Sequence, residues 1–200
     1  MTGVGKRNGG KRAGFTLKTV SDETGMAVYD DHERKIKHGP FTRELIIEKP
    51  ADGDPVHSVE ITIKTPLRLK YENKLHAELP FHILIRAMLR RASSLLSYHG
   101  NGEPDLDYRG LVERAKGVEI KRSSLRWFDW KRYSNKQDQA MLMGGMVGRV
   151  AYAGDLTEFL PLIRFCEKAH IGKQTSFGLG RIEITGMNKA VKVSRDVNIQ

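Results

Sequence analysis

The sequence has little cysteine and no long apolar segment, and both shortages exclude classes of protein. Cys166 is the single cysteine among 200 residues, so an internal disulfide framework is impossible. The longest uncharged apolar stretch, residues 140–148, is about half as long as a bilayer-spanning helix. A secretory signal has a hydrophobic segment after its charged N-terminus, and no such segment follows the charged N-terminus here. The sequence therefore predicts a cytoplasmic protein, long enough to bury a core without disulfides or a structural metal.

Acidic residues are also in short supply, and this shortage points to a polyanionic partner. The chain has 24 Asp and Glu against 34 Lys and Arg, with a net charge of +10 and a pI near 9.7. Residues 114–136 supply a net +6 of that excess. The basic residues in this window are Arg114, Lys116, Lys121, Arg122, Arg126, Lys131, Arg132 and Lys136. A soluble chain with such a charge most often binds nucleic acid.

Aromatic residues are concentrated in the same basic window. Trp127, Phe128, Trp130 and Tyr133 all lie within it, and the chain has no other tryptophan. Basic groups attract phosphates while aromatic faces stack on unpaired bases, so the mixture favours a surface for single-stranded nucleic acid. The alternative is a basic β-hairpin whose aromatic side chains belong to the core.

The chain divides into a small N-terminal part and a larger C-terminal part. Residues 1–13 are predicted to be a flexible basic arm, since they have too few apolar side chains to fold alone. Residues 14–50 are predicted to form a partial β unit. Its strand-like runs are Phe15–Val20, Met26–Tyr29 and Arg43–Glu48. Residues 49–55 have the turn chemistry of a boundary between units.

Residues 56–186 are predicted to form an α+β module, followed by a tail at 187–200. The pattern predicts strands at 56–67, 118–133, 143–152 and 177–185, long helices at 80–99 and 155–172, and a short helix at 108–116. Asp155 with Glu158 resembles a capping box at the start of the last helix. The exposed face of the first helix carries His82, Arg86 and Arg90. The order β-α-β-β-α-β is the ferredoxin-like arrangement.

The most unusual stretch is HIGKQTSFGLG at residues 170–180. Gly172, Gly178 and Gly180 allow a close approach of the backbone to a phosphate chain, and Lys173 adds a positive charge. The alternative is that Gly172 ends a helix and the later glycines ease a strand past a neighbouring helix. A P-loop is excluded, because Glu167 stands where that motif needs its first glycine.

His170 is predicted to lie at the C-terminal end of the last helix. Carbonyl dipoles there favour a protonated imidazole, which can donate a proton near neutral pH, although many histidines at helix ends have no such role. Cys166 and His170 also have the spacing of two zinc ligands, but no other cysteine and no nearby second histidine completes a site. No metal site is therefore predicted.

Several segments together resemble a known family. They are VEITIKTPLRLK, FHILIRAMLRRASSLLSYHG, DWKRYSNKQDQAMLMGGMVGRVAYAGDLTEFLPLI and AHIGKQTSFGLGRIEI. The run Ser134–Gln137, the GGMVG at 144–148 and the final glycine-rich motif are specific as a set. Over residues 14–185 the chain resembles the CRISPR-associated repeat-RNA-processing endoribonucleases of the RAMP superfamily.

The resemblance implies a fold, a reaction and partners. Members of this family resemble two ferredoxin-like modules in tandem and cut repeat RNA without metal or cofactor, leaving a cyclic phosphate and a 5′-hydroxyl. Here the N-terminal β unit is incomplete, so the partners expected are CRISPR repeat RNA, other effector subunits, or a chain that completes the first module. The alternatives are a non-catalytic RNA-binding subunit of a CRISPR effector complex and a basic RNA-binding domain outside CRISPR biology.

Candidate site residues follow from these two lines of reasoning. For catalysis we expect His170 as acid or base, Lys173 as phosphate stabiliser and Tyr133 as a weaker candidate. His82 and His99 are the next histidines to test. For RNA binding we expect Arg126, Trp130, Lys131, Arg132, Arg149, Gly172, Gly178, Gly180 and Arg181.

Overall fold

The computed structural model describes residues 16–22, 24–37, 44–49, 53–69, 77–134 and 139–189. The predicted arm at 1–13 lies outside these ranges, as does most of the predicted tail. The chain divides into two compact units, residues 1–45 and 46–200. Each unit is described by itself. In the described residues no helix is long and apolar enough to cross a membrane.

The described part of the first unit is a small antiparallel sheet of β1 (Thr19–Ser21), β2 (Ala27–Asp30) and β3 (Lys35–Ile36), in that order. The strand expected at Arg43–Glu48 is wrong for its described residues, 44–48, which belong to no strand. The third strand forms earlier because a tight turn follows β2. The Asp30 side chain accepts a hydrogen bond from the His32 amide at 2.8 Å, and Arg34 adopts a positive φ of 49°.

The second unit contains a sheet in the order β10-β4-β9-β5, with every neighbour antiparallel. Its strands are β4 (Val56–Leu67), β5 (Glu119–Ser123), β9 (Gly145–Ala153) and β10 (Ile182–Lys189), and β6 (Arg126–Phe128) also pairs with β9. The strand predicted at residues 56–67 is confirmed at both ends.

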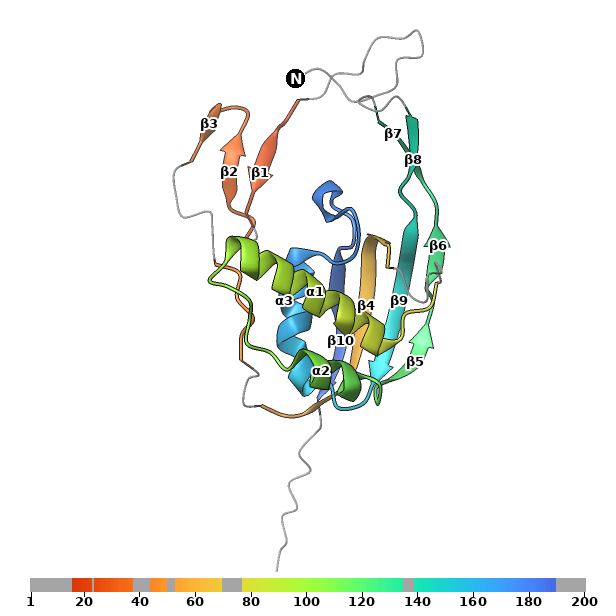
Figure 1. The fold of residues 1–200 in the computed structure, drawn as a ribbon. Coiled ribbons are helices and arrows are strands. Elements are labelled where there is room, and N and C mark those ends of the chain that lie inside the picture. Colours follow the sequence, from red (N-terminus) through yellow and green to blue (C-terminus); the bar gives the residue numbers. More distant parts are fainter. Residues whose placement is uncertain are drawn as a thin grey trace, which may run out of the picture. The chain divides into compact units, whose positions relative to one another are not determined.

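Three helices cover one face of this sheet, as Figure 1 shows. They are α1 (Phe81–His99), α2 (Tyr108–Ala115) and α3 (Leu160–Ala169). Alternate residues of β4 face the helices and are buried, because apolar side chains alternate with polar ones along it. The element order confirms the predicted ferredoxin-like β-α-β-β-α-β module.

Aromatic rings occupy the centre of the core beneath α1. The Phe81 ring lies 4.9 Å from Tyr152 and 5.1 Å from Phe159, measured between ring centroids. The Tyr152 hydroxyl donates to the Leu79 carbonyl at 2.7 Å, and burial raises the pKa of this hydroxyl. The buried Tyr152 hydroxyl thus has a hydrogen-bond partner in the backbone just before α1 begins, as buried polar groups usually do.

The strand predicted at residues 118–133 is interrupted. It divides into β5, β6 and β7 (Lys131–Ser134), and β7 forms a hairpin with β8 (Gln139–Leu142). The first break falls at Ser124, whose amide donates to the Arg149 carbonyl at 2.8 Å. Gly148 lies opposite with a φ of 122°, and a Cβ there would collide with the Ser124 carbonyl.

The last helix begins later than predicted. The capping box at Asp155 and Glu158 is wrong, because a 3₁₀ turn at Thr157–Phe159 precedes α3, which has no side-chain cap. Glu158 instead accepts hydrogen bonds from the Arg114 guanidinium at 2.8 Å. The final strand also begins at Ile182 rather than at residue 177, because the glycine-rich segment forms a loop.

Candidate RNA-binding and active site

Residues 170–181, here called the glycine loop, connect α3 to β10 and rest on the end of β4. The Gly180 amide donates to the Pro66 carbonyl at 3.1 Å, and the Thr65 hydroxyl donates to the Gly178 carbonyl at 2.9 Å. The Lys173 amide donates to the Arg68 carbonyl at 3.1 Å. These three contacts use backbone groups of the loop, and the exposed Lys173 side chain is left available for a ligand.

The three glycines of this loop have different roles. A Cβ at Gly180 would collide with the Ile171 carbonyl, and one at Gly172 would lie 2.8 Å from the Arg68 carbonyl. Gly178 has a φ of 77° but open space around it. Gly172 does not end α3, because His170 is the residue at the helix C-cap. Gly180 thus allows a close backbone contact inside the loop, and Gly172 allows one with the backbone that follows β4.

His170 has an unusual backbone and an oriented imidazole. Its φ of 55° and ψ of 159° fall in a region that glycine adopts readily and other residues adopt at a cost of about 1–3 kcal/mol. Its half-buried ring places Nδ1 3.2 Å from the Leu179 carbonyl. Since a carbonyl accepts a hydrogen bond, Nδ1 carries the proton and Nε2 is left to give or take one.

Lys173 and Gln174, further along the loop, differ in exposure. The Lys173 side chain is exposed and ends in a primary ammonium group. Gln174 has a left-handed backbone, and its Oε1 is buried with no hydrogen-bond partner among the described residues. A buried acceptor without a donor is costly, so this loop carries a second local strain besides that of His170.

The other predicted RNA-binding residues lie along β6, β9 and the hairpin. Strand register places Arg126 of β6 and Arg149 of β9 on the same side of the sheet, and both side chains are exposed. Trp130 is half-buried, and its indole N–H has no partner among the described residues. Lys131, Arg132 and Tyr133 belong to β7, but their side chains lie outside the described residues.

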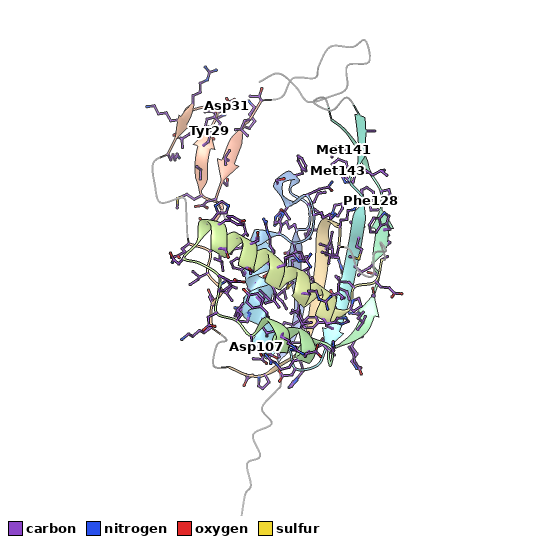
Figure 2. The ribbon with its side chains drawn as sticks, viewed as in Figure 1. Tyr29, Asp31, Asp107, Phe128, Met141 and Met143 are labelled. Carbon is purple, nitrogen blue, oxygen red and sulfur yellow. The ribbon has the colours of Figure 1, made fainter. Side chains whose placement is uncertain are left out.

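The described aromatic side chains of the basic window are half-buried or exposed, and none of them belongs to the buried core. The Trp127 indole donates to the Asp129 carboxylate at 2.7 Å. Phe128, labelled in Figure 2, is 43% exposed on β6. Phe128 is therefore a candidate for base stacking that the sequence named only as one of four aromatic residues in the basic window.

The predicted residues gather at one end of the sheet. The glycine loop brings together His170, Lys173 and Arg181, and in Figure 1 the loop and the β7–β8 hairpin extend from the same end. Arg68 links these two regions, since its Nη1 donates to the Leu142 carbonyl at 3.1 Å. The sequence missed Arg68, although its place directly after a strand was a usable signal.

The centre of the open sheet face is a different kind of surface. Lys64 of β4 pairs with Glu183 of β10 at 3.0 Å, and this contact lowers the pKa of the Glu183 carboxyl. Arg122 of β5 pairs with Glu60 of β4 at 3.0 Å. The described residues of β4 and β10 on this face include Ser58, Glu60, Thr62, Lys64, Glu183, Thr185, Gly186 and Asn188, none of them aromatic.

Metal ligands are not gathered in the described residues, where no three His, Cys, Asp or Glu side chains form a group that could hold an ion. Cys166 is buried with its thiol 3.9 Å from the Met88 carbonyl. Burial raises the pKa of this thiol, which opposes the thiolate that zinc requires. The Cys166 and His170 spacing therefore reflects helix packing.

The fold and this end of the sheet define a ferredoxin-like protein with a basic glycine loop and an adjacent basic hairpin. The sequence profile described as "CRISPR-associated endoribonuclease Cas6" matches residues 61–182. The chain therefore belongs to the Cas6 family.

The solved structures to which this chain is similar include Cas6 chains. A Cas6 product complex shares 20% identity, covering 68% of this chain and 54% of that one, with a TM-score of 0.46. Thermus thermophilus Cas6 shares 13% identity over 66% and 55% of the two chains, with a TM-score of 0.44. A partial Cas6-RT-Cas1–Cas2 complex shares 14% identity over 93% and 32%, with a TM-score of 0.50. This chain thus spans about half the length of the Cas6 chains it matches. No curated protein matches it in sequence.

Proposed function

We propose that this chain binds CRISPR precursor RNA and cleaves it within the repeats to generate guide RNAs. Membership of the Cas6 family supports this proposal. The observation that carries it is His170, a strained residue whose Nδ1 is oriented by the Leu179 carbonyl in a loop that also holds Lys173. Strained, oriented residues are typical of active sites.

The chemistry proposed is a transesterification within the RNA. The ribose 2′-oxygen bonds to the adjacent phosphorus while the bond from phosphorus to the 5′-oxygen breaks. A base takes the 2′-hydroxyl proton and an acid gives a proton to the leaving oxygen, so the products are a 2′,3′-cyclic phosphate and a 5′-hydroxyl. This reaction requires no metal.

Three residues are assigned to this step. His170 acts through Nε2 as acid or base, because Nδ1 is engaged with the Leu179 carbonyl. Lys173 stabilises the negative charge that grows on the phosphate. Tyr133 is the candidate for the second proton-transfer group, with His82 and His99 as the next residues to test.

The RNA is held on both sides of the loop. Arg126, Trp130, Lys131, Arg132 and Arg149 contact it from the hairpin and the neighbouring strands. Gly172, Gly178, Gly180 and Arg181 contact it from the loop. Among these glycines Gly178 has open space around it, so a phosphate can approach its backbone closely.

The test uses the full chain and a 5′-labelled repeat RNA in EDTA. We expect one cut per repeat at an unchanged rate with and without the chelator, and a product that ends in a cyclic phosphate. An RNA with a single 2′-deoxy substitution at the cut position is the matched control and should remain intact. A product with a 5′-phosphate, or cutting of the deoxy control, would contradict this mechanism.

A second candidate function is a non-catalytic RNA-binding subunit of a CRISPR effector complex. The observation that favours it is the small first unit, in which the described residues form three short strands. In that case the partners include other effector subunits or a chain that completes the first module. Tight binding of the repeat with no cutting, even after a candidate partner is added, would select this function.

A further inference from the structure

A groove of about 370 Å³ lies between α1, the end of β4 and the glycine loop. Its polar lining consists of Arg68 from the end of β4, Arg90, Arg91 and Ser94 from α1, and Gly172 with Lys173 from the loop. We call it the arginine groove. It belongs wholly to the second unit.

The arginine groove has an uncompensated positive charge. Its lining includes no acidic residue, and none of its four cations pairs with a carboxylate in the part of the chain that the structure describes. Some cations elsewhere are compensated: Arg114, for example, binds both Asp107 and Glu158. Four like charges around one groove repel one another, so an anion bound there is strongly favoured.

Two of the guanidinium groups are already held in place. Arg91 donates from Nε and Nη2 to the Ala169 carbonyl, each at 3.0 Å, and so closes the end of α3. Arg68 donates from Nη1 to the Leu142 carbonyl at 3.1 Å. A guanidinium has five N–H donors, so both keep donors for a ligand. Because they are fixed in advance, binding costs them less side-chain freedom.

The other two cations are exposed and adjustable. Arg90 projects from the exposed side of α1, and Lys173 follows Gly172 in the loop. The Lys173 amide donates to the Arg68 carbonyl, so the loop and the end of the strand form one connected wall. A groove with fixed and adjustable cations suits a chain of phosphates, whose groups bind arginine forks and lysine point charges.

We propose that the arginine groove binds the phosphate backbone of the RNA strand beside the position of the cut. This assignment rests on the proposed function, because it takes the RNA to be the ligand. Lys173 lines the groove and belongs to the catalytic loop, so the groove fixes the strand's direction relative to His170. It gives α1 a part in RNA binding.

The test compares two exposed arginines one helical turn apart. Arg90 lines the groove, whereas Arg86 on the same side of α1 does not. Binding of the full chain is measured by fluorescence anisotropy at several salt concentrations, with a repeat RNA that carries a 2′-deoxy substitution at the cut. Melting temperatures are recorded for both variants to confirm folding.

We expect Arg90→Ala to weaken binding by roughly three- to tenfold and to reduce the slope of log affinity against log salt by about 0.7, the loss of one phosphate contact on a single strand. Arg86→Ala should leave affinity within about twofold, since Arg86 does not line the groove and a cation that contacts no phosphate releases no counterion. Equal affinity and slope for Arg90→Ala and wild type would overturn the groove. That result leaves the proposed function intact if wild type still cuts the repeat.

A second arm distinguishes an RNA strand from a small anion. Sodium phosphate and sodium chloride are compared as competitors at equal ionic strength. We expect phosphate to displace the RNA from the wild type at least as effectively as chloride, because the inorganic anion and the RNA phosphates compete for the same cations. If titration calorimetry detects phosphate binding that Arg90→Ala removes while the affinity for RNA is unchanged, the groove is a site for free phosphate and the RNA assignment is wrong. Because the arm measures binding alone, it remains informative even if the chain never cuts RNA.

Discussion

The β4 and β10 residues of the open sheet face and the glycine-loop end of the same sheet treat their charges in opposite ways. On the face, Lys64 pairs with Glu183 and Arg122 pairs with Glu60. At the loop end, Lys173 and Arg90 have no carboxylate partner among the described residues. A paired charge has little attraction left for a ligand, whereas an unpaired one has most of it.

The difference bears on where the proposed RNA contact lies on this ferredoxin-like module. Many RNA-binding modules with such a sheet stack bases on aromatic side chains of the open face. The described residues of β4 and β10 on this face offer no aromatic side chain. The loop end offers cations, glycines and a strained histidine instead. We therefore place RNA contact and chemistry at the loop end, and the following predictions test that placement.

The largest effect is expected at His170. Replacement by glycine should slow cleavage by about 10²- to 10⁴-fold, the usual contribution of a proton-transfer group. The free energy of unfolding should change little, because relief of about 1–3 kcal/mol of backbone strain offsets the lost hydrogen bond and the added chain entropy. Single-turnover cleavage and urea denaturation measure the two quantities.

Two companion variants control this experiment. His170→Ala keeps the strained backbone and should be less stable than His170→Gly, with the same loss of cleavage. His99→Ala removes another histidine at a helix end. If His99→Ala abolishes cutting while His170→Gly cuts normally, the proposal that the chain cleaves RNA stands, but the active site lies at the end of α1 and not at His170.

A smaller effect, on stability, tests whether the loop is a built structure. Gly180→Ala should lower the free energy of unfolding by roughly 3 kcal/mol, because its Cβ collides with the Ile171 carbonyl at a positive φ. Gly178→Ala is the matched control with a similar φ and open space, so it should cost only about 1 kcal/mol. If the two variants lower the free energy of unfolding equally in urea denaturation, the close contact between Gly180 and the Ile171 carbonyl does not stabilise the loop.

The sheet face should respond weakly to loss of charge. Lys64→Ala is expected to change affinity for repeat RNA by less than about twofold, since Glu183 already compensates this cation. The comparison at equal net charge is Arg90→Ala. If Lys64→Ala weakens RNA binding as much as Arg90→Ala does, the contrast between the two regions is broken.

The smallest expected effect is a change in the pKa of His82 when Arg86 is replaced. Burial, then the positive charges of Arg86 and Lys116, lower the pKa of His82 below its ordinary value of 6.5. Arg86→Ala should raise this pKa toward that value in an NMR titration. Below pH 6.5 the unfolded chain binds this proton more readily than the folded chain does. The free energy of unfolding therefore decreases as the pH is lowered, until the folded histidine is protonated as well. A His82 pKa above 6.5 would contradict the account.

The sequence predicted the parts of the fold in which periodicity is strong. The alternation of Val59, Ile61 and Ile63 marked β4, and Pro80 marked the start of α1. It failed where a long-range contact decides. Glu158 was expected to cap α3, but Arg114, distant in sequence, binds its carboxylate. Ser124 interrupts the long strand because the backbone of Arg149 lies opposite.

The candidate site was predicted in part for the same reason. The glycine loop was recognisable because its residue types are unusual and adjacent in sequence. The arginine groove was not, since Arg68 and Arg91 come from separate elements and each is positioned by a carbonyl far along the chain. His170 was predicted at the helix end, but its positive φ depends on how the loop packs on β4.

The most direct test of where RNA binds is photo-crosslinking of the full chain to a repeat RNA that carries 4-thiouridine near the cut, with the attached peptides identified by mass spectrometry. We predict crosslinks to residues 170–181, to the β7–β8 hairpin and to α1 around Arg90. Crosslinks confined to the β4 and β10 residues of the open face away from Arg149, such as Ser58 and Thr185, would contradict the central claim.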